Sequence, residues 1–142
     1  LEAVMKESLR KYPPELRLER RVSAEGAKIG EIPMEKDVLI IVPTIALHHN
    51  PEYFPDPERF DPERFSPENK HHLVPYAYLP FGAGPRNCIG NRFAYQVAKL
   101  CWASLLLKYQ FRPTVDTPKK LKFVSGNMSL LMPTFPLAIS AR

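Results

Sequence analysis

The residues with the clearest chemical potential lie in a loop from Phe81 to Gly90, with the sequence Phe-Gly-Ala-Gly-Pro-Arg-Asn-Cys-Ile-Gly. Its cysteine, Cys88, directly precedes a predicted long helix, whose free N–H groups and dipole favour a thiolate over a thiol. The glycines let the backbone approach a flat ligand closely, and Arg86 offers a charged fork for a carboxylate. A thiolate iron ligand beside a carboxylate clamp is what a haem with its propionates requires.

The same loop also has simpler interpretations. A free cysteine is most often a small buried hydrophobic residue. The glycine spacing, and Pro80 in the place of a preceding strand, do not fit a dinucleotide-binding fingerprint. Cys88 and Cys101 are too far apart for a zinc knuckle, and no Cys-x-x-Cys-His sequence for covalent haem attachment is present. Two histidine pairs lie in proline-rich segments, where we expect exposed loops. These pairs are His48-His49 and His71-His72.

A second group of charged residues begins on the predicted first helix, where Glu7 and Arg10 stand three positions apart. Such pairs are usually solvated surface bridges that contribute a few tenths of a kcal/mol. The sequence Pro-Glu-Arg-Phe occurs twice downstream and supplies two further arginines, Arg59 and Arg64. Charge alone does not say which of these residues meet.

The loop resembles a known family. It fits the pattern Phe-x-x-Gly-x-Arg-x-Cys-x-Gly, which is similar to the haem-thiolate signature of the cytochrome P450 superfamily, at Phe81, Gly84, Arg86, Cys88 and Gly90. The resemblance implies that these five residues bind haem b and that Cys88 is the axial ligand of its iron. It implies no catalytic acid or base here, because the family carries those residues on a helix that has no counterpart in this chain.

The resemblance also assigns the charged residues. Glu7 and Arg10 are similar to the Glu-x-x-Arg signature of the family's K helix. The arginine of Pro-Glu-Arg-Phe is implied to join them in a buried network that holds an irregular segment under the haem pocket. We choose Arg64 over Arg59 because the family places this element nearer the cysteine and after a first Pro-x-x-Phe segment. Replacing Glu7, Arg10 or Arg64 by alanine is then expected to prevent haem incorporation.

The segment after the first helix is similar to a stretch that lines the family's substrate pocket. By that similarity Arg20 joins Arg86 in binding the haem propionates. Glu15, Leu16 and Leu18 are implied to face the pocket or its edge. The sequence Ala-Leu-His at residues 46–48, with the haem loop, resembles animal microsomal enzymes that oxidise drugs and steroids.

The elements that position these residues follow from periodicity and proline placement. We expect a helix over residues 1–12, stopped by Pro13 and Pro14, and short strands between residues 16 and 42. Residues 44–49 favour one or two helical turns, and residues 51–67 favour irregular, proline-rich structure. Residues 89–108 predict a helix that is apolar almost all round and therefore mostly buried, followed by short strands to the end of the chain.

These elements are predicted to form a mainly α fold with small β-sheets. The resemblance implies the cytochrome P450 fold, with a K helix, short strands, a proline-rich meander, the haem-thiolate loop, a long L helix and a terminal β-hairpin. Residues 1–142 are then expected to be the C-terminal portion of a single domain whose N-terminal two thirds are absent. The first helix also lacks a capping residue, which indicates a fragment.

Composition limits the classes of partner. The chain has 44% hydrophobic and 25% charged residues, a composition that excludes a collagen, a coiled coil or a wholly disordered tail. The net charge of +5 favours acidic partners. The basic residues are scattered along the sequence, so no nucleic-acid partner is expected. No apolar run approaches the roughly 20 residues of a membrane span, so any anchor is expected outside this chain. Two cysteines suggest a reducing compartment.

One polar stripe interrupts the long apolar helix, because Arg92, Gln96 and Lys99 fall at positions i, i+4 and i+7. Two interpretations are open. The stripe is either a docking face for an acidic reductase or a solvated face.

The resemblance implies a haem-thiolate monooxygenase that inserts one oxygen atom of O2 into a lipophilic steroid, lipid or xenobiotic. Electrons are expected from an NADPH-dependent cytochrome reductase. The expected location is the cytoplasmic face of the endoplasmic reticulum membrane, through an N-terminal anchor. Two alternatives are a haem-binding or sensing protein without oxygenase activity and an inactive truncated product.

Overall fold

The computed structural model of the chain describes residues 1–119, 121, 124–125, 129–131 and 134–142. Its helices are α1 (Glu2–Lys11), α2 (Thr44–His48) and α3 (Asn91–Lys108), with single 3₁₀ turns η1 (Pro62–Phe65), η2 (Lys70–His72) and η3 (Gly84–Arg86). The described strands form two-stranded antiparallel sheets: β1 (Leu18–Arg21) with β4 (Leu39–Val42), β2 (Lys28–Ile29) with β3 (Ile32–Pro33), β5 (Tyr109–Pro113) with β8 (Leu137–Ala141), and β6 (Val124–Ser125) with β7 (Leu130–Leu131). The predicted combination of helices and small sheets is confirmed.

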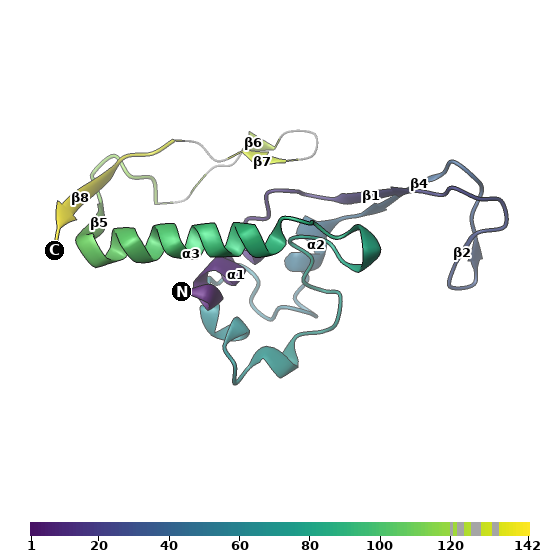
Figure 1. Cartoon of the computed structure of the whole chain (residues 1–142), viewed down its shortest axis with the longest axis horizontal. Helices are drawn as coiled ribbons and strands as arrows, with labels where there is room; N and C mark the ends of the chain where they lie inside the picture. Colours follow the sequence, from purple (N-terminus) through teal and green to yellow (C-terminus); the bar gives the residue numbers. More distant parts are fainter. Residues whose placement is uncertain (120, 122–123, 126–128, 132–133) are drawn as a thin grey trace.

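Helix α1 lies between α3 and the irregular segment of residues 51–67, which we call the meander (Figure 1). It ends at Lys11, as the Pro13-Pro14 sequence predicts, because a proline ring clashes with the preceding helical turn. Its two buried residues are charged, Glu7 and Arg10. The helix therefore turns a polar face, not an apolar one, towards the meander.

The meander is irregular apart from η1, as expected, yet it supplies two of the four buried hydrophobic residues of the described chain, Phe54 and Phe65. Phe54, Phe65 and Ala77 are buried together, with Tyr53 and Tyr78 among the side chains packed against them. The proline-rich middle is therefore the best-packed part of the molecule.

Strands β1 and β4 form a ribbon that leads away from the helices to the β2–β3 hairpin (Figure 1). Residues 38–42 are a continuous apolar run, which is typical of a strand covered on both faces. In the structure burial alternates instead, with Leu39 and Ile41 exposed and Ile40 and Val42 half-buried. The ribbon is covered on one face, because only that face is turned towards the rest of the chain.

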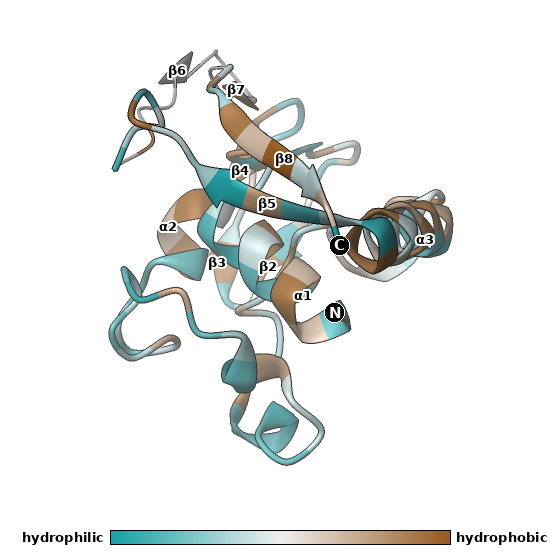
Figure 2. Ribbon diagram, turned by 90° about the vertical axis from the view of Figure 1, so that its left-hand side faces the viewer, coloured by the Kyte–Doolittle hydropathy of each residue, from teal (hydrophilic) through white to brown (hydrophobic). Residues whose placement is uncertain are grey.

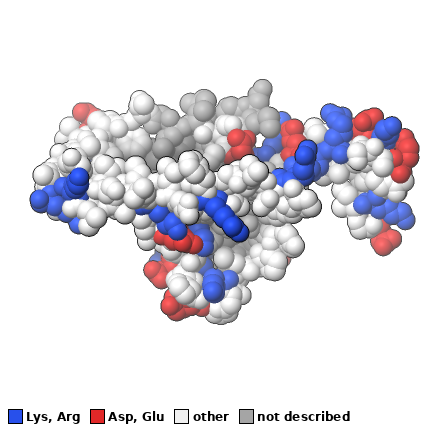
Figure 3. Space-filling view, in the orientation of Figure 1, with Lys and Arg blue, Asp and Glu red and all other residues white. Residues whose placement is uncertain are grey.

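Helix α3 differs most from expectation, since none of its 18 residues is buried. Hydrophobic residues lie on several sides of it (Figure 2), and the space-filling surface along it is largely uncharged (Figure 3). Phe93, Leu100 and Leu107 are each at least 70% exposed. Among the described elements α3 packs mainly against α1 and β5, so much of its circumference is left exposed. Among the described residues, no helix is long and apolar enough to cross a membrane.

The C-terminal region contains strands, as predicted, but they are not a simple terminal hairpin. Strand β5 continues directly from α3 and pairs with the last strand, β8, in a register that joins Tyr109 to Ala141. The β6–β7 pair lies within the long connection between them. Parts of that connection lie outside the described residues.

Candidate functional site

Cys88 stands at the end of a closed loop that joins the meander region to α3. Its N–H donates a hydrogen bond to the carbonyl of Phe81 at 2.8 Å, and the N–H of Asn87 donates to the carbonyl of Gly84 at 3.1 Å. Gly82 and Gly84 have φ values of +73° and +75°, a conformation that favours glycine. The loop therefore keeps its shape through backbone hydrogen bonds and torsions, and the thiol is left exposed.

Two arginines lie beside this loop. A guanidinium N–H of Arg20, on β1, donates to the carbonyl of Arg86 at 3.4 Å, so β1 passes directly along the loop. Both arginines are exposed, and neither forms an ion pair within the described part of the chain. Guanidinium groups without acidic partners next to an exposed thiol are free to bind a ligand that carries carboxylates and a metal ion. The donor set fits a haem.

Three more of the predicted haem and substrate residues, Phe81, Gly90 and Leu18, lie in or near the loop. The ring of Phe81 packs edge-on against Tyr95 of α3, with centroids 5.3 Å apart. A Cβ atom at Gly90 would lie 3.9 Å from the Cys88 sulfur, an ordinary contact, so nothing in this chain requires glycine there. Leu18 lies near the loop, because its Cδ1 atom would be 3.8 Å from a Cβ atom added at Gly82.

The two remaining pocket candidates lie between α1 and β1. Leu16 is half-buried, and its carbonyl accepts a hydrogen bond from the N–H of Ile45. Glu15 is exposed and pairs with Ser129 in an isolated β-bridge, where the serine hydroxyl donates to its carboxylate at 3.3 Å. The structure therefore places Leu18 near the loop and Glu15 against the C-terminal region.

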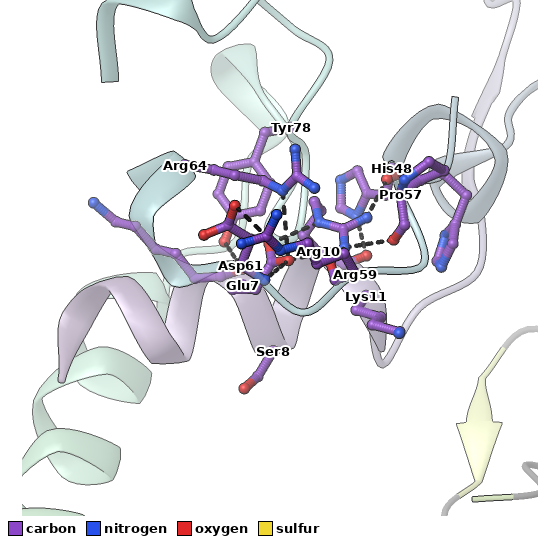
Figure 4. Close-up of polar contacts among 12 residues, drawn as sticks. Glu7, Ser8, Arg10, Lys11, His48, Pro57, Arg59, Asp61, Arg64 and Tyr78 are labelled. Atoms are coloured by element: carbon purple, nitrogen blue, oxygen red, sulfur yellow. Dashed lines mark hydrogen bonds and ion pairs between the residues drawn. The ribbon is translucent and has the colours of Figure 1, made fainter. Parts of the chain in front are cut away.

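The structure brings Glu7, Arg10 and Arg64 into one cluster (Figure 4). Arg10 grips the carboxylate of Glu7 with both arms of its fork: Nε donates to Oε2 at 2.7 Å and Nη2 donates to Oε1 at 2.9 Å. Both side chains are fully buried. The N–H of Asp61 donates to Oε1 of Glu7 at 2.8 Å, which attaches the carboxylate to the meander as well.

Arg10 also holds backbone carbonyls that regular secondary structure does not use. Its Nη1 donates to the carbonyl of His48 at 2.8 Å, and its Nη2 donates to the carbonyl of Pro57 at 2.8 Å. One guanidinium thereby connects α1, the end of α2 and the meander. The charge of Arg10 can remain buried because its guanidinium N–H groups donate to the Glu7 carboxylate and to these backbone carbonyls.

The two Pro-Glu-Arg-Phe copies occupy different environments. Arg64 is 12% exposed, with Nε 3.7 Å from Oε1 of Glu7, and its Nη2 donates to the carbonyl of Asp56 at 2.9 Å. Its Nε is buried without a hydrogen-bond partner, so its attraction to Glu7 is Coulombic. The side chain of Arg59 is 69% exposed, and its Nε lies 4.0 Å from Oδ2 of Asp61. Arg64, and not Arg59, contacts Glu7.

His48 is a residue that the sequence analysis placed wrongly, as part of an exposed loop. It is fully buried, with its ring stacked on Tyr78 at 5.3 Å. Burial lowers its pKa to about 4, because the charged imidazolium would lose its hydration. Its second ring nitrogen accepts a hydrogen bond from the N–H of Leu79 at 2.8 Å, close to the start of the Cys88 loop. The Ala-Leu-His resemblance was the available signal. By contrast, His71 and His72 are exposed, as predicted.

Comparison with known proteins identifies the family. Residues 1–140 match the family model described as Cytochrome P450. The chain belongs to the cytochrome P450 family. It is 47% identical over 139 residues to Cytochrome P450 3A27 of Oncorhynchus mykiss and 45% identical over 139 residues to Cytochrome P450 3A1 of Rattus norvegicus. Each alignment covers 98% of this chain but only 26% and 27% of those proteins, so the chain spans about a quarter of their length. Cytochrome P450 9e2 of Blattella germanica is 41% identical over 92% of this chain and 25% of its own length.

The polar stripe of this P450 chain divides into two parts. Arg92 and Gln96 are exposed. Lys99 instead forms an ion pair with Glu2 of α1 at 3.2 Å. Hydrogen bonds from Lys6 and Lys99 lower the pKa of Glu2. Part of the stripe therefore joins α3 to α1, and the rest faces solvent.

The cluster of Glu7, Arg10 and Arg64 predicts a ranking of alanine variants. Arg10→Ala leaves the buried Glu7 charge without its main partner and should lower the free energy of unfolding by about 3–5 kcal/mol. Arg64→Ala removes a weaker attraction and one hydrogen bond and should cost about 1–3 kcal/mol. Urea unfolding followed by circular dichroism measures both. Arg59→Ala, from the equivalent position of the other copy, is the control and should change stability by less than about 0.5 kcal/mol. Equal losses for Arg59→Ala and Arg64→Ala would contradict the ranking.

Buried His48 predicts a pH dependence of stability. The unfolded chain binds a proton on this residue below about pH 6.5, whereas the folded chain does so only below about pH 4. Stability should therefore fall by about 3 kcal/mol as the pH is lowered from 6.5 to 4. Urea unfolding at several pH values should show a shallower decline in His48→Gln, which has no proton to bind. His49→Gln is the control, and parallel profiles for His48→Gln and the unmodified protein would refute the assignment.

Proposed function

We propose that the chain is the C-terminal portion of a haem-thiolate monooxygenase. In this proposal the enzyme inserts one atom of O2 into a lipophilic organic substrate and receives electrons from an NADPH-dependent cytochrome reductase. The observation that carries the proposal is the exposed Cys88 thiol at the end of a closed loop, beside Arg20 and Arg86, which lack acidic partners in the described chain. Membership of the cytochrome P450 family supports the same reaction class.

Each residue of the loop has a specific task in this proposal. Cys88 supplies the axial thiolate, and Arg20 with Arg86 bind the propionates of haem b. Gly84 gives the loop its positive φ, and Phe81 fixes the loop against α3. When bound, the haem supplies the activation of O2, with the thiolate favouring O–O cleavage. We assign no catalytic acid or base to this chain, whose part is to hold and orient the cofactor.

The cluster of Glu7, Arg10 and Arg64 has a supporting task. It keeps the meander against α1, and the chain runs on from the meander through residues 68–80 into the loop. Glu15, Leu16 and Leu18 contribute to the edge of the substrate pocket. The proposed location is the cytoplasmic face of the endoplasmic reticulum membrane.

The reduced carbon-monoxide spectrum of the full-length protein tests the thiolate assignment. A strongly red-shifted Soret band is expected, because a thiolate donates electron density to the iron. Cys88→Ser should lose this band. Cys101→Ser is a matched control, since Cys101 is also an exposed free thiol but lies on α3. Retention of the band in Cys88→Ser would reject the assignment.

Substrate-dependent oxidation of NADPH then distinguishes an oxygenase from a haem-binding sensor. An oxygenase consumes NADPH faster when a lipophilic substrate is added, whereas a sensor does not. Residues 1–142 expressed alone should show neither property if the chain is a truncated product.

The stripe of Arg92, Gln96 and Lys99 is the proposed docking face for an acidic reductase. Lys99→Glu should slow reductase-driven electron transfer at low salt while leaving substrate binding unchanged, because a reversed charge repels an acidic partner. The same change breaks the ion pair with Glu2, so Glu2→Gln serves as the control for that effect alone. Arg92 forms no ion pair among the described residues, so Arg92→Glu breaks none. This variant should slow electron transfer at least as much. Unchanged turnover in both reversals would exclude the docking role.

A further inference from the structure

We infer that His48 is a positioning residue that aligns the Cys88 loop with the Glu7–Arg10 ion pair through two hydrogen bonds from one neutral imidazole. The inference rests on the proposed haem-thiolate function and assigns His48 a specific part in it. Both ring nitrogens of His48 are hydrogen-bonded, the ring is buried, and the two nitrogens join different segments of the chain.

The hydrogen-bond partners determine the tautomer. The N–H of Leu79 is a donor, so Nε2 of His48, 2.8 Å away, must accept and cannot carry a proton. Nδ1 therefore carries the proton and donates it to the carbonyl of Arg10 at 3.2 Å. A protonated imidazolium has no acceptor nitrogen and would lose the bond to Leu79. The low pKa of the buried ring keeps it neutral near pH 7.

The two bonds join segments that carry different functional groups. Arg10 lies in the last turn of α1 and grips Glu7. Leu79 lies two residues before Phe81, whose carbonyl accepts the hydrogen bond from the Cys88 N–H. The carbonyl of Leu79 in turn accepts from the N–H of Gly82. A short series of hydrogen bonds therefore runs from the ion pair through His48 to the thiol-bearing loop.

The surroundings of the ring leave it a single position. It stacks on Tyr78, with ring planes 27° apart, and meets Phe54 edge-on at 6.3 Å. Its own carbonyl accepts a hydrogen bond from Arg10 at 2.8 Å. Both the backbone and the side chain of His48 are thus attached to Arg10, so the ring cannot move independently of the ion pair.

The test compares four forms of the full-length haem protein: unmodified, His48→Phe, His48→Gln and His49→Phe. Phenylalanine keeps the flat, stacking shape but has no hydrogen-bonding atoms, so Leu79 and Arg10 each lose a partner. Glutamine carries an N–H donor group and a carbonyl acceptor, the two functions needed to replace the bonds to Arg10 and Leu79. His49 is the matched control, because it lies next to His48 but bonds only locally, to the carbonyl of Ile45.

The measurement is the ratio of the red-shifted, thiolate-type Soret band to the unshifted band in the reduced carbon-monoxide spectrum, at equal haem content. We expect His48→Phe to lose most of the thiolate-type band, His48→Gln to recover it, and His49→Phe to retain it. A merely structural role would lower total haem content without changing this ratio. An unchanged ratio in His48→Phe would overturn the inference. So would an equal loss in His48→Gln, because packing alone would then explain the effect.

A second measurement covers the case in which His48→Phe does not fold. In the unmodified protein labelled with ¹⁵N-histidine, nuclear magnetic resonance should report His48 as the neutral tautomer with its proton on Nδ1. A proton on Nε2 would overturn the inference without any variant. Absence of the thiolate-type band in the unmodified protein would instead reject the proposed function. In that case the measured tautomer of His48 would still test its hydrogen bonds to Leu79 and Arg10.

Discussion

The structure depends on one constraint, the burial of the Glu7 carboxylate. A carboxylate with no exposure to water is tolerated only when its oxygens are bonded and its charge is balanced. The fork of Arg10, the N–H of Asp61 and the nearby Arg64 meet both requirements. These partners come from α1 and from the meander, so satisfying the charge also fixes the relative position of two segments far apart in the sequence.

Arginine is suited to this task because the meander lacks a regular hydrogen-bond pattern. Prolines have no N–H donor, and irregular backbone leaves carbonyls without the partners that a helix or sheet would provide. The carbonyls of Pro57 and Asp56 accept from Arg10 and Arg64 instead. A lysine has fewer donors and no planar fork, and could not hold a carboxylate and several carbonyls together. The proline excess and the buried arginines are two aspects of the same arrangement.

The end of α1 and the main residues of the candidate site were predictable from local sequence. Pro13 marked the end of α1, and the resemblance at Glu7, Arg10 and Cys88 selected the residues around which the site is built. The choice of Arg64 over Arg59 depended on its order along the chain, because both copies have the same four residues. The roles of His48 and α3 were not predictable from periodicity. His48 lies in a proline-rich segment, and its burial depends on contacts with the distant residues Tyr78 and Leu79. Whether the apolar helix α3 is covered depends on its tertiary neighbours.

The loop itself has little packing to hold it, which makes its attachment to the rest of the chain important. Arg86, Cys88 and Ile89 are exposed, and the loop contributes no residue to the buried cluster of Phe54, Phe65 and Ala77. Its shape comes from glycine torsions and backbone hydrogen bonds, which define the turn but do not orient it. Orientation must come from the places where other segments meet it. These are β1, through Arg20, α3, through the contact of Tyr95 with Phe81, and His48, which accepts a hydrogen bond from Leu79 just before the loop.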